Sequence, residues 1–227
     1  MISMSAILKI RLGVASSYLI KGERGYILVD AGLKNKEGKL LRFLKKKKID
    51  PKEIKLIVIT HVHGDHVGSL KAIKNITNAK ILVHEKEKEL LKKGESCPAI
   101  PISKFFKMFS SLMPEKAHRY ESVEPNIIIE DNFPLQDFGF NAKIIHTPGH
   151  TKGSISLIDE EGNAFIGDIA MGFPMNFSAG LPIIAESLDE VKKSWKRILE
   201  EGAKILHLSH GGIVNSSVLK KFLEKKE

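Results

Sequence analysis

A single cysteine, Cys97, occurs in the 227 residues, so the chain cannot close an internal disulfide. No apolar run approaches the roughly 18 residues that a membrane-spanning helix needs, and no segment is expected to cross a bilayer. The first residues, "MISMSAILKIRLG", lack the basic-then-apolar layout and the cleavage site of a secretory signal. Low-complexity segments and flexible linkers are also missing. These absences favour a soluble, cytoplasmic protein.

Positive charge is in excess, with 36 Lys and Arg against 27 Asp and Glu and a formal net charge of +9. The lysines occur in runs such as "LKKKKID", "KEKELLKKG" and "LKKFLEKKE", where leucines and glutamates alternate with them. This pattern is typical of the solvated face of an amphipathic helix. No nucleic-acid-binding motif accompanies the charge. We therefore expect a small-molecule substrate rather than a nucleic acid.

Apolar, β-branched runs alternate with segments of helical periodicity in the first part of the chain. Strands are predicted at "GYILVDAG", "IKLIVITH" and "AKILVHE", and helices at "EGKLLRFLKKKK", "GSLKAIKNI" and "KEKELLKKG". A βαβα order implies a sheet with helices packed on its faces. In the second part, strands are predicted at "NIIIE", "NAKIIHTPG", "SISLIDEEG" and "NAFIGDIA", and helices at "LDEVKKSWKRILEEG" and from about Val214. The sequence therefore predicts an α/β protein.

The two ends of the chain resemble each other in their order of elements. "YILVDAG" and "AFIGDIA" each end near an aspartate, Asp30 and Asp168, and the strands that follow end in His61 and His210. We expect one domain over residues 1–227, made of similar halves at about 1–93 and 126–227. Polar side chains would then gather beyond the ends of the strands, where ligand sites of such sheets lie.

The stretch "THVHGDH" places four ligand-type side chains within six residues. Alternate residues of an extended chain point the same way, so His61 and His63 can hold one metal ion together. Gly64 permits a backbone bend, and a helix starting near Asp65 would aim Asp65 and His66 at a second ion. Four such residues in six positions indicate a metal site.

Later segments supply partners for this stretch. His150 lies on the turn of "HTPGHTKGS", Asp168 lies in "FIGDIA", and His210 lies in "LSHGG". Together the candidates comprise five imidazoles and two carboxylates. Divided between two ions, they give three nitrogens at one position and two nitrogens with Asp65 at the other, with Asp168 shared. An open position for water remains, as catalytic zinc requires.

In combination, "VDAG", "THVHGDH", "TPGHT", the aspartate at 168 and "SHG" resemble the metallo-β-lactamase-fold hydrolase superfamily. The resemblance extends over nearly the whole chain. It implies a four-layer αβ/βα sandwich, in which two mixed β-sheets carry helices on their outer faces. It also implies that Asp30 supports the site without binding metal. The ligands it implies are, for the first ion, His61, His63 and His150, for the second, Asp65, His66 and His210, and, as the bridge, Asp168.

The chemistry implied by the resemblance is metal-dependent hydrolysis. Two divalent ions, with Zn²⁺ expected and Mn²⁺ or Fe²⁺ as alternatives, would share a hydroxide that attacks a carbonyl or phosphoryl centre. Asp65 would be catalytic, because it lies beside that hydroxide in the family and can orient it or pass a proton to the leaving group. We therefore expect an enzyme with a binuclear metal site.

The substrate stays open among a thioester, a lactone and a small phosphoester. Asp168 argues against a true metallo-β-lactamase, because those enzymes lack an aspartate bridge at this position. The 17 residues after His210 leave no room for the glutathione-binding domain of glyoxalase II. Three alternatives remain: an iron-dependent oxidoreductase of the same fold (a persulfide dioxygenase or a diiron enzyme), a nuclease acting on RNA or single-stranded DNA, and a non-catalytic binding module.

Two apolar segments could border the site. The irregular stretch 94–125 holds a stripe at helical spacing, which would serve as a lid, as a contact in a homodimer, or as core packing; its members are Phe105, Phe109, Leu112 and Met113. The loop after Asp168 could line a substrate pocket through Phe173, Met175 and Phe177.

Three of the remaining histidines and the cysteine are expected to have no part in the chemistry. Packed or hydrogen-bonded positions are predicted for His84, His146 and His207, whereas His118 has no predicted role. Cys97 lies among prolines with no cationic neighbour to activate it, and we expect it to be inert.

Overall fold

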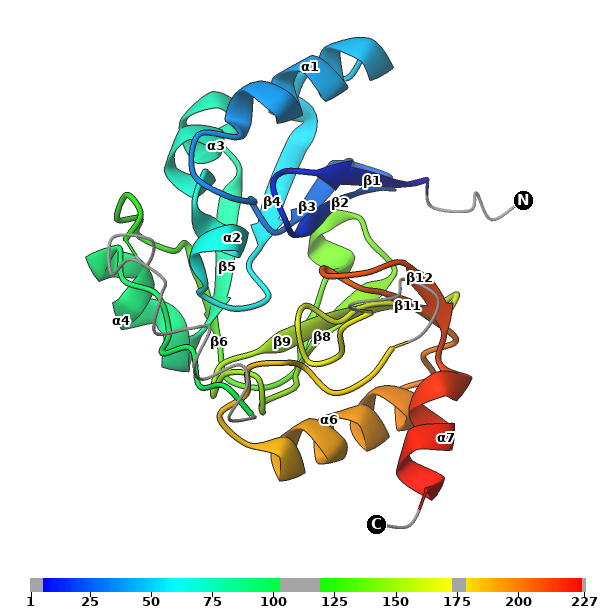
Figure 1. Cartoon of the computed structure of the whole chain (residues 1–227). Coiled ribbons are helices and arrows are strands. Elements are labelled where there is room, and N and C mark those ends of the chain that lie inside the picture. Colours follow the sequence, from blue (N-terminus) through cyan, green and yellow to red (C-terminus); the bar gives the residue numbers. More distant parts are fainter. Residues whose placement is uncertain (1–5, 103–118, 173–178, 226–227) are drawn as a thin grey trace.

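Two six-stranded sheets face each other at the centre of the protein in the computed structural model (Figure 1). The structure describes residues 6–102, 119–172 and 179–225. The first sheet, in spatial order, contains β1 (Ile7–Arg11), β2 (Ser16–Gly22), β3 (Gly25–Val29), β4 (Ile54–Val58), β5 (Lys80–His84) and β6 (Ile127–Ile129). The second contains β12 (Ile213–Asn215), β11 (Ile205–His207), β10 (Asn163–Phe165), β9 (Ile155–Asp159), β8 (Ala142–His146) and β7 (Phe133–Pro134).

Helices cover the outer face of each sheet (Figure 1). Those on the first sheet are α1 (Glu37–Lys47), α3 (Leu70–Thr77) and α4 (Glu85–Lys93), together with the single turn α2 (Gly64–Val67). Those on the second are α6 (Leu188–Glu200) and α7 (Ser217–Glu224). Short 3₁₀ turns occur at Pro51–Glu53 and Gln136–Phe138.

Both sheets are mixed. Strands β3, β4, β5 and β6 run parallel, whereas β1 and β2 extend the sheet as antiparallel strands. In the second sheet only β10 and β11 are parallel. The central strand β4 is buried on both faces, which explains its nearly continuous apolar sequence.

Three separate apolar cores define the layers. The core between the sheets contains Leu56 and Val58 of β4 with Phe165 of β10. A second core joins the first sheet to its helices through side chains such as Leu44. A third joins the other sheet to α6 around Trp195. These three cores separate four layers, so the predicted αβ/βα sandwich is confirmed.

Several local predictions differ from the structure. The strand predicted over "NAFIGDIA" ends at Phe165, because Gly167 takes a left-handed φ of 55° and Asp168 lies in the turn that follows. The strand at 127–129, which the sequence pattern placed in the second half, pairs with β5 as an edge of the first sheet. A helix predicted from about Val214 begins at Ser217, after the short strand β12.

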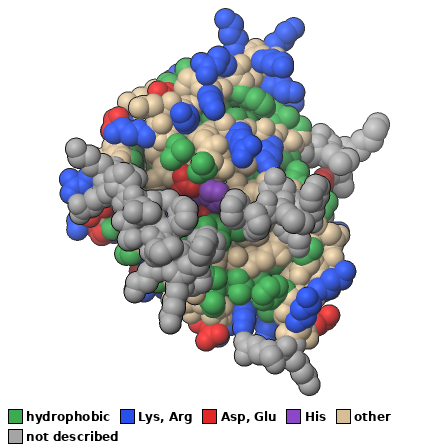
Figure 2. Space-filling model, viewed as in Figure 1, with side chains coloured by type: hydrophobic (Ala, Val, Ile, Leu, Met, Phe, Trp, Pro, Cys, Tyr) green, Lys and Arg blue, Asp and Glu red, His purple; other side chains and the backbone are tan. Residues whose placement is uncertain are grey.

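The lysine run at the end of α1 is exposed, as its pattern predicted. Lys45 and Lys48 lie at its ends, while Leu40 and Leu44 turn inward to the core. Figure 2 shows the resulting cluster of basic side chains at the top of the molecule, over α1. Among the described residues, no helix has the length and apolar character that crossing a membrane requires.

Candidate metal centre

The ends of β4, β8, β10 and β11 bring the predicted ligands together. His61 and His63 follow β4, and His63 is the residue directly before α2. The turn of α2 then carries Asp65 and His66, which confirms the helix start predicted near Asp65. All but two of the seven predicted side chains are buried; the exceptions, Asp65 and His210, are each 22% exposed. In Figure 2 a histidine side chain reaches the surface in the middle of this face, beside an acidic group.

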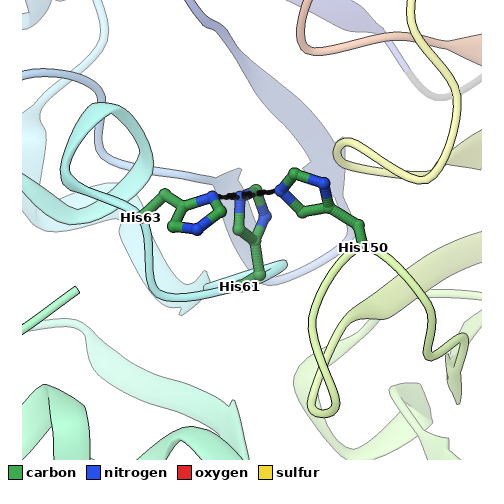
Figure 3. A group of neighbouring side chains, drawn as sticks. All are labelled: His61, His63 and His150. Carbon is green, nitrogen blue, oxygen red and sulfur yellow. Dashed lines mark hydrogen bonds between the residues drawn. The ribbon is translucent and has the colours of Figure 1, made fainter. Parts of the chain in front are cut away.

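Three histidines form one compact cluster (Figure 3). His61 Nε2 lies 3.0 Å from His63 Nδ1 and 3.2 Å from His150 Nε2, and the last two atoms are 3.0 Å apart. Nitrogens bound tetrahedrally to zinc at about 2.0–2.1 Å would be about 3.3 Å apart. The three ring nitrogens therefore already have the mutual spacing of ligands around one small cation.

Asp65, His66 and His210 form the second cluster. His210 Nε2 lies 3.0 Å from Asp65 Oδ2, and His66 Nε2 lies 3.8 Å from the same oxygen. The burial of this group is uneven, because His66 is fully enclosed while the other two reach solvent.

Asp168 lies between the two clusters. Its Oδ2 atom is 3.3 Å from His210 Nε2 on one side and 3.8 Å from His150 Nε2 on the other. Its Oδ1 atom is 3.4 Å from His66 Nε2. Neither Asp168 Oδ1 nor His66 Nε2 has a hydrogen-bond partner among the described residues, although both are buried. Such orphaned atoms cost about 1–3 kcal/mol each unless another group binds them, so this donor set fits a bound metal cation.

Asp30 and Thr60 fix the orientation of two ligands from behind. Asp30 Oδ2 accepts hydrogen bonds from His66 Nδ1, at 2.8 Å, and from the Thr60 hydroxyl, also at 2.8 Å. With its proton used in this way, Thr60 Oγ1 is free to accept one from His61 Nδ1 at 3.2 Å. Both imidazoles are thereby left with Nε2 unprotonated and facing the cluster, the form that binds metal. The supporting role predicted for Asp30 agrees with these contacts.

Electrostatics distinguishes the two clusters. Burial and the neighbouring imidazoles lower the pKa of His61 well below its usual value, and burial likewise lowers the pKa of His150. For His210, burial acts in the same direction, but Asp168 and Asp65 outweigh it and raise the pKa to about 10. The imidazoles of His61 and His150 are therefore neutral, and a neutral imidazole nitrogen can bind a cation. At the second cluster a metal ion would displace protons.

Three other histidines, all among the described residues, lie outside the site. His84 and His146 stack on each other with ring centroids 4.0 Å apart, and each bonds a backbone carbonyl through Nε2. His207 stacks on Phe165 and bonds Asn163. These contacts confirm the predicted packed positions.

Cys97 is buried, and burial together with Glu87 raises its pKa, so it is no reactive thiolate. Some other candidates lie outside the described residues, so the lid, dimer and pocket hypotheses stay predictions: these are Phe105, Phe109, Leu112, Met113, His118, Phe173, Met175 and Phe177.

Sequence patterns missed three supporting residues. Thr60 and Thr151 adjoin motif histidines, and the signal for Thr60 is its position at the start of "THVHGDH". Glu87 carried no signal, because it lies in a run of charged residues that reads as an exposed helix face; the structure buries it to 1% exposure.

An open cavity of about 700 Å³ lies apart from this site. It adjoins Ile54 and Lys80, where β4 and β5 begin, whereas the ligands follow the opposite end of β4. Basic side chains border it: Arg24, Lys52, Lys55 and Lys80.

Comparisons with known proteins agree with the fold and the ligand clusters. A profile of the metallo-beta-lactamase superfamily matches residues 10–210. A metallo-beta-lactamase fold-containing protein of Sulfurisphaera tokodaii is 28% identical over 227 residues, which cover 94% of this chain and 80% of that protein. A probable metallo-hydrolase of Methanocaldococcus jannaschii is 34% identical over 146 residues, covering 64% of this chain and 63% of the relative.

A third relative and a solved structure complete the comparison. The human acyl-coenzyme A thioesterase MBLAC2 is 26% identical over 166 residues, covering 68% of this chain and 58% of the relative. The match thus spans less than two thirds of the length of this relative and of the M. jannaschii protein. A metallo-beta-lactamase family protein of Thermus thermophilus has the same fold, with a TM-score of 0.70 at 21% identity over 96% of this chain and 78% of its own. The chain belongs to the metallo-beta-lactamase superfamily, a family of metal-binding proteins that includes hydrolases.

Proposed function

We propose that this protein is a hydrolase that uses two divalent metal ions. The observation that carries the proposal is the pair of ligand clusters joined by Asp168, whose Oδ1 atom is buried without a hydrogen-bond partner among the described residues. The three-histidine cluster would hold one ion, Asp65, His66 and His210 would hold the other, and Asp168 would contact both. Zn²⁺ suits these nitrogen and oxygen ligands best, with Mn²⁺ or Fe²⁺ as alternatives.

Bound metal ions would polarise the scissile carbonyl or phosphoryl group and lower the pKa of water toward neutrality. Asp65 is the chain's own contribution to the reaction. Burial opposes its ionisation, but His66 and His210 outweigh burial and lower its pKa to about 2, so its carboxylate is ionised at neutral pH. At 22% exposure it lies between the buried ligands and solvent, where it can orient the attacking water and carry a proton to the leaving group.

The substrate class that we propose is a small ester-like molecule, with a thioester first. One relative that matches 68% of this chain is named an acyl-coenzyme A thioesterase, which supports that choice. A lactone and a small phosphoester remain alternatives, because the same two-ion arrangement can attack any of these centres.

Metal removal and replacement tests the proposal. We would assay metal-free protein and protein reloaded with Zn²⁺ or Mn²⁺ against an acyl-coenzyme A thioester, a lactone and a nitrophenyl phosphoester. The reloaded protein should hydrolyse at least one of these substrates, and the metal-free protein should hydrolyse none of them. His207→Ala serves as the control, because it removes a buried histidine outside the ligand set. If the reloaded protein hydrolyses nothing in this set, the proposal is wrong for these substrate classes.

A further inference from the structure

Glu87 is a buried carboxylate for which the metal-binding motifs give no reason. It lies on α4 and is 1% exposed. Burial raises its pKa, and hydrogen bonds from Thr151, Cys97 and two backbone amides act against that rise. A carboxylate in such a place is costly unless donors surround it, so its partners indicate what it does.

Four donors converge on the two oxygens of Glu87. Oε2 accepts from the backbone N–H of Val62, at 2.5 Å, and from the Cys97 thiol, at 3.1 Å. Oε1 accepts from the Thr151 hydroxyl and from the backbone N–H of Gly153, the latter at 3.2 Å. The two oxygens therefore accept hydrogen bonds from two different ligand-bearing loops.

The first of these loops carries two ligands. Val62 lies between His61 and His63, and its N–H is bound by Glu87. Its carbonyl accepts a hydrogen bond from the backbone N–H of Cys97 at 2.8 Å. Both peptide groups that separate the two histidines are therefore fixed, and with them the directions in which the two rings point.

The second loop carries the third ligand. Thr151 follows His150 directly, and Gly153 comes two residues later. A Cβ atom on Gly153 would lie 2.2 Å from Glu87 Cγ, so the glutamate side chain fills the space where that atom would be. This contact leaves little freedom for the loop to move relative to α4.

We propose that Glu87 is a positioning residue that joins the two ligand-bearing loops of the three-histidine cluster and thereby sets the metal affinity of that cluster. The loops come from different sheets, since one follows β4 and the other follows β8, and one carboxylate contacts both. The inference rests on the proposed two-ion site.

The test is a titration of metal-free protein with Zn²⁺ or Co²⁺ in competition with a chromophoric chelator. Glu87→Gln has the same shape, but its NH₂ group must face either the Val62 or the Gly153 amide, and two donors cannot bond. The affinity for one of the two ions should fall by about 10–100-fold, as is usual for residues that orient ligands, while that for the other stays unchanged. The same change made in a His63→Ala protein should leave the remaining ion unaffected.

Two further variants separate positioning from charge and from general stability. Glu87→Asp keeps the charge, but its side chain is one methylene too short to reach both loops. It should therefore lower the affinity for the same ion. Ser216→Ala removes a buried hydrogen bond to Ala203 far from these loops and should lower stability without changing either affinity. If Glu87→Gln does not fold, Thr151→Val replaces it and should lower the affinity for the same ion. Thr151→Ser keeps the hydroxyl and should leave that affinity unchanged.

The possible outcomes are distinct. Wild-type protein that binds fewer than two ions contradicts the proposed function itself. Wild-type protein that binds two ions, with a folded Glu87→Gln variant that binds both equally well, contradicts only the role given to Glu87. Unchanged affinity in Glu87→Asp would also overturn it, because charge alone would then suffice.

Discussion

Asp30 supports the ligands from a backbone conformation that few residues adopt. Its φ of 61° places it in the left-handed region, where aspartate and asparagine are tolerated better than most side chains. From there its two oxygens accept hydrogen bonds from the Thr60 amide, the Thr60 hydroxyl and His66. The strain of the turn is therefore coupled to the orientation of a ligand in each cluster, because Thr60 also contacts His61.

Asp30→Asn tests this coupling. Asparagine keeps the conformation at this position, but its NH₂ group must face a donor on Thr60 or His66. We expect metal affinity to fall by about 10–100-fold, with loss of activity in proportion. Chelator competition measures the first and circular dichroism checks that the fold is kept. Full metal affinity in the folded variant would show that this hydrogen-bond chain has no effect on the ligands.

His63→Ala tests the assignment of the first cluster. The variant should bind one ion fewer per chain and lose nearly all activity, because one of three nitrogens is missing. The two sheets should persist, with a stability loss of about 1 kcal/mol, typical for a single substitution. Elemental analysis and circular dichroism check both points. A variant that kept full activity with a single ion bound would show that the cluster is wrongly assigned.

At the scale of residues, the motifs predicted the seven candidate ligands, and the family resemblance predicted the support from Asp30, but neither pointed to Thr60, Thr151 or Glu87. "THVHGDH" concentrates rare ligand types, and the structure brings all seven together. The role of Glu87 was not predicted, because its burial depends on contacts with residues distant in the sequence. Thr151 and Gly153 are 64 and 66 residues away from it. Local periodicity carries no information about such contacts.

Helix α4 begins at a histidine that is held neutral. His84 Nδ1 accepts the Lys86 N–H as the helix cap, while its Nε2–H donates to the Glu130 carbonyl at 2.8 Å. Burial, and then the stacked ring of His146, lowers the pKa of His84 to about 4, although the hydrogen bond to the Glu130 carbonyl acts in the opposite direction. Protonation would abolish the cap, because Nδ1 would then become a donor.

This histidine should make stability depend on pH. Its pKa is lower in the folded state than the value of about 6.5 in the unfolded chain, so the unfolded chain binds the proton more readily between these values. The contribution of His84 is therefore complete above pH 6.5 and is lost as pH falls toward 4. Urea unfolding measures the free energy of unfolding of the wild type and of His84→Asn, whose side chain caps a helix without titrating. Plotted against pH, the two free energies should converge or cross between pH 6.5 and 4. A constant difference between them would contradict the argument.

At the scale of elements, the long helices were predicted, whereas two of the shortest strands were not. The helices of eight or more residues in the described chain repeat their apolar pattern over at least two turns, and α1, α3 and α6 begin within a few residues of their predicted starts. The strands β7 and β12 contain two and three residues, too few for an alternating pattern to register. Their pairing depends on a sheet that forms around them.

At the scale of the whole molecule, the candidate metal centre lies where the ends of strands from both sheets meet. His61 comes from the first sheet and His150, Asp168 and His210 come from the second, so neither sheet alone holds a complete ligand set. The order of elements predicted this arrangement, since each half places an aspartate and a histidine at strand ends. It could not predict which loops lie over the site, because those depend on packing between distant segments.

The four basic residues around the cavity lie away from the ligand clusters, and this leads to a prediction about salt. The basic residues around the cavity are separated from the ligands by the length of β4, about 16 Å, and the Debye length at physiological salt is about 8 Å. We expect hydrolysis of a neutral ester to change by less than about twofold between 50 and 200 mM salt, because screened charges exert little force on a substrate without net charge. Tight RNA binding lost by about 10³-fold over the same range would favour a nuclease instead.

The most direct measurement is the metal content of protein purified without added metal, determined by elemental analysis as moles of each metal per chain. The account predicts about two ions of zinc or manganese per chain, because the described residues contain two ligand clusters joined by Asp168. A single iron ion per chain would contradict it and would favour oxygen-dependent chemistry on the same fold.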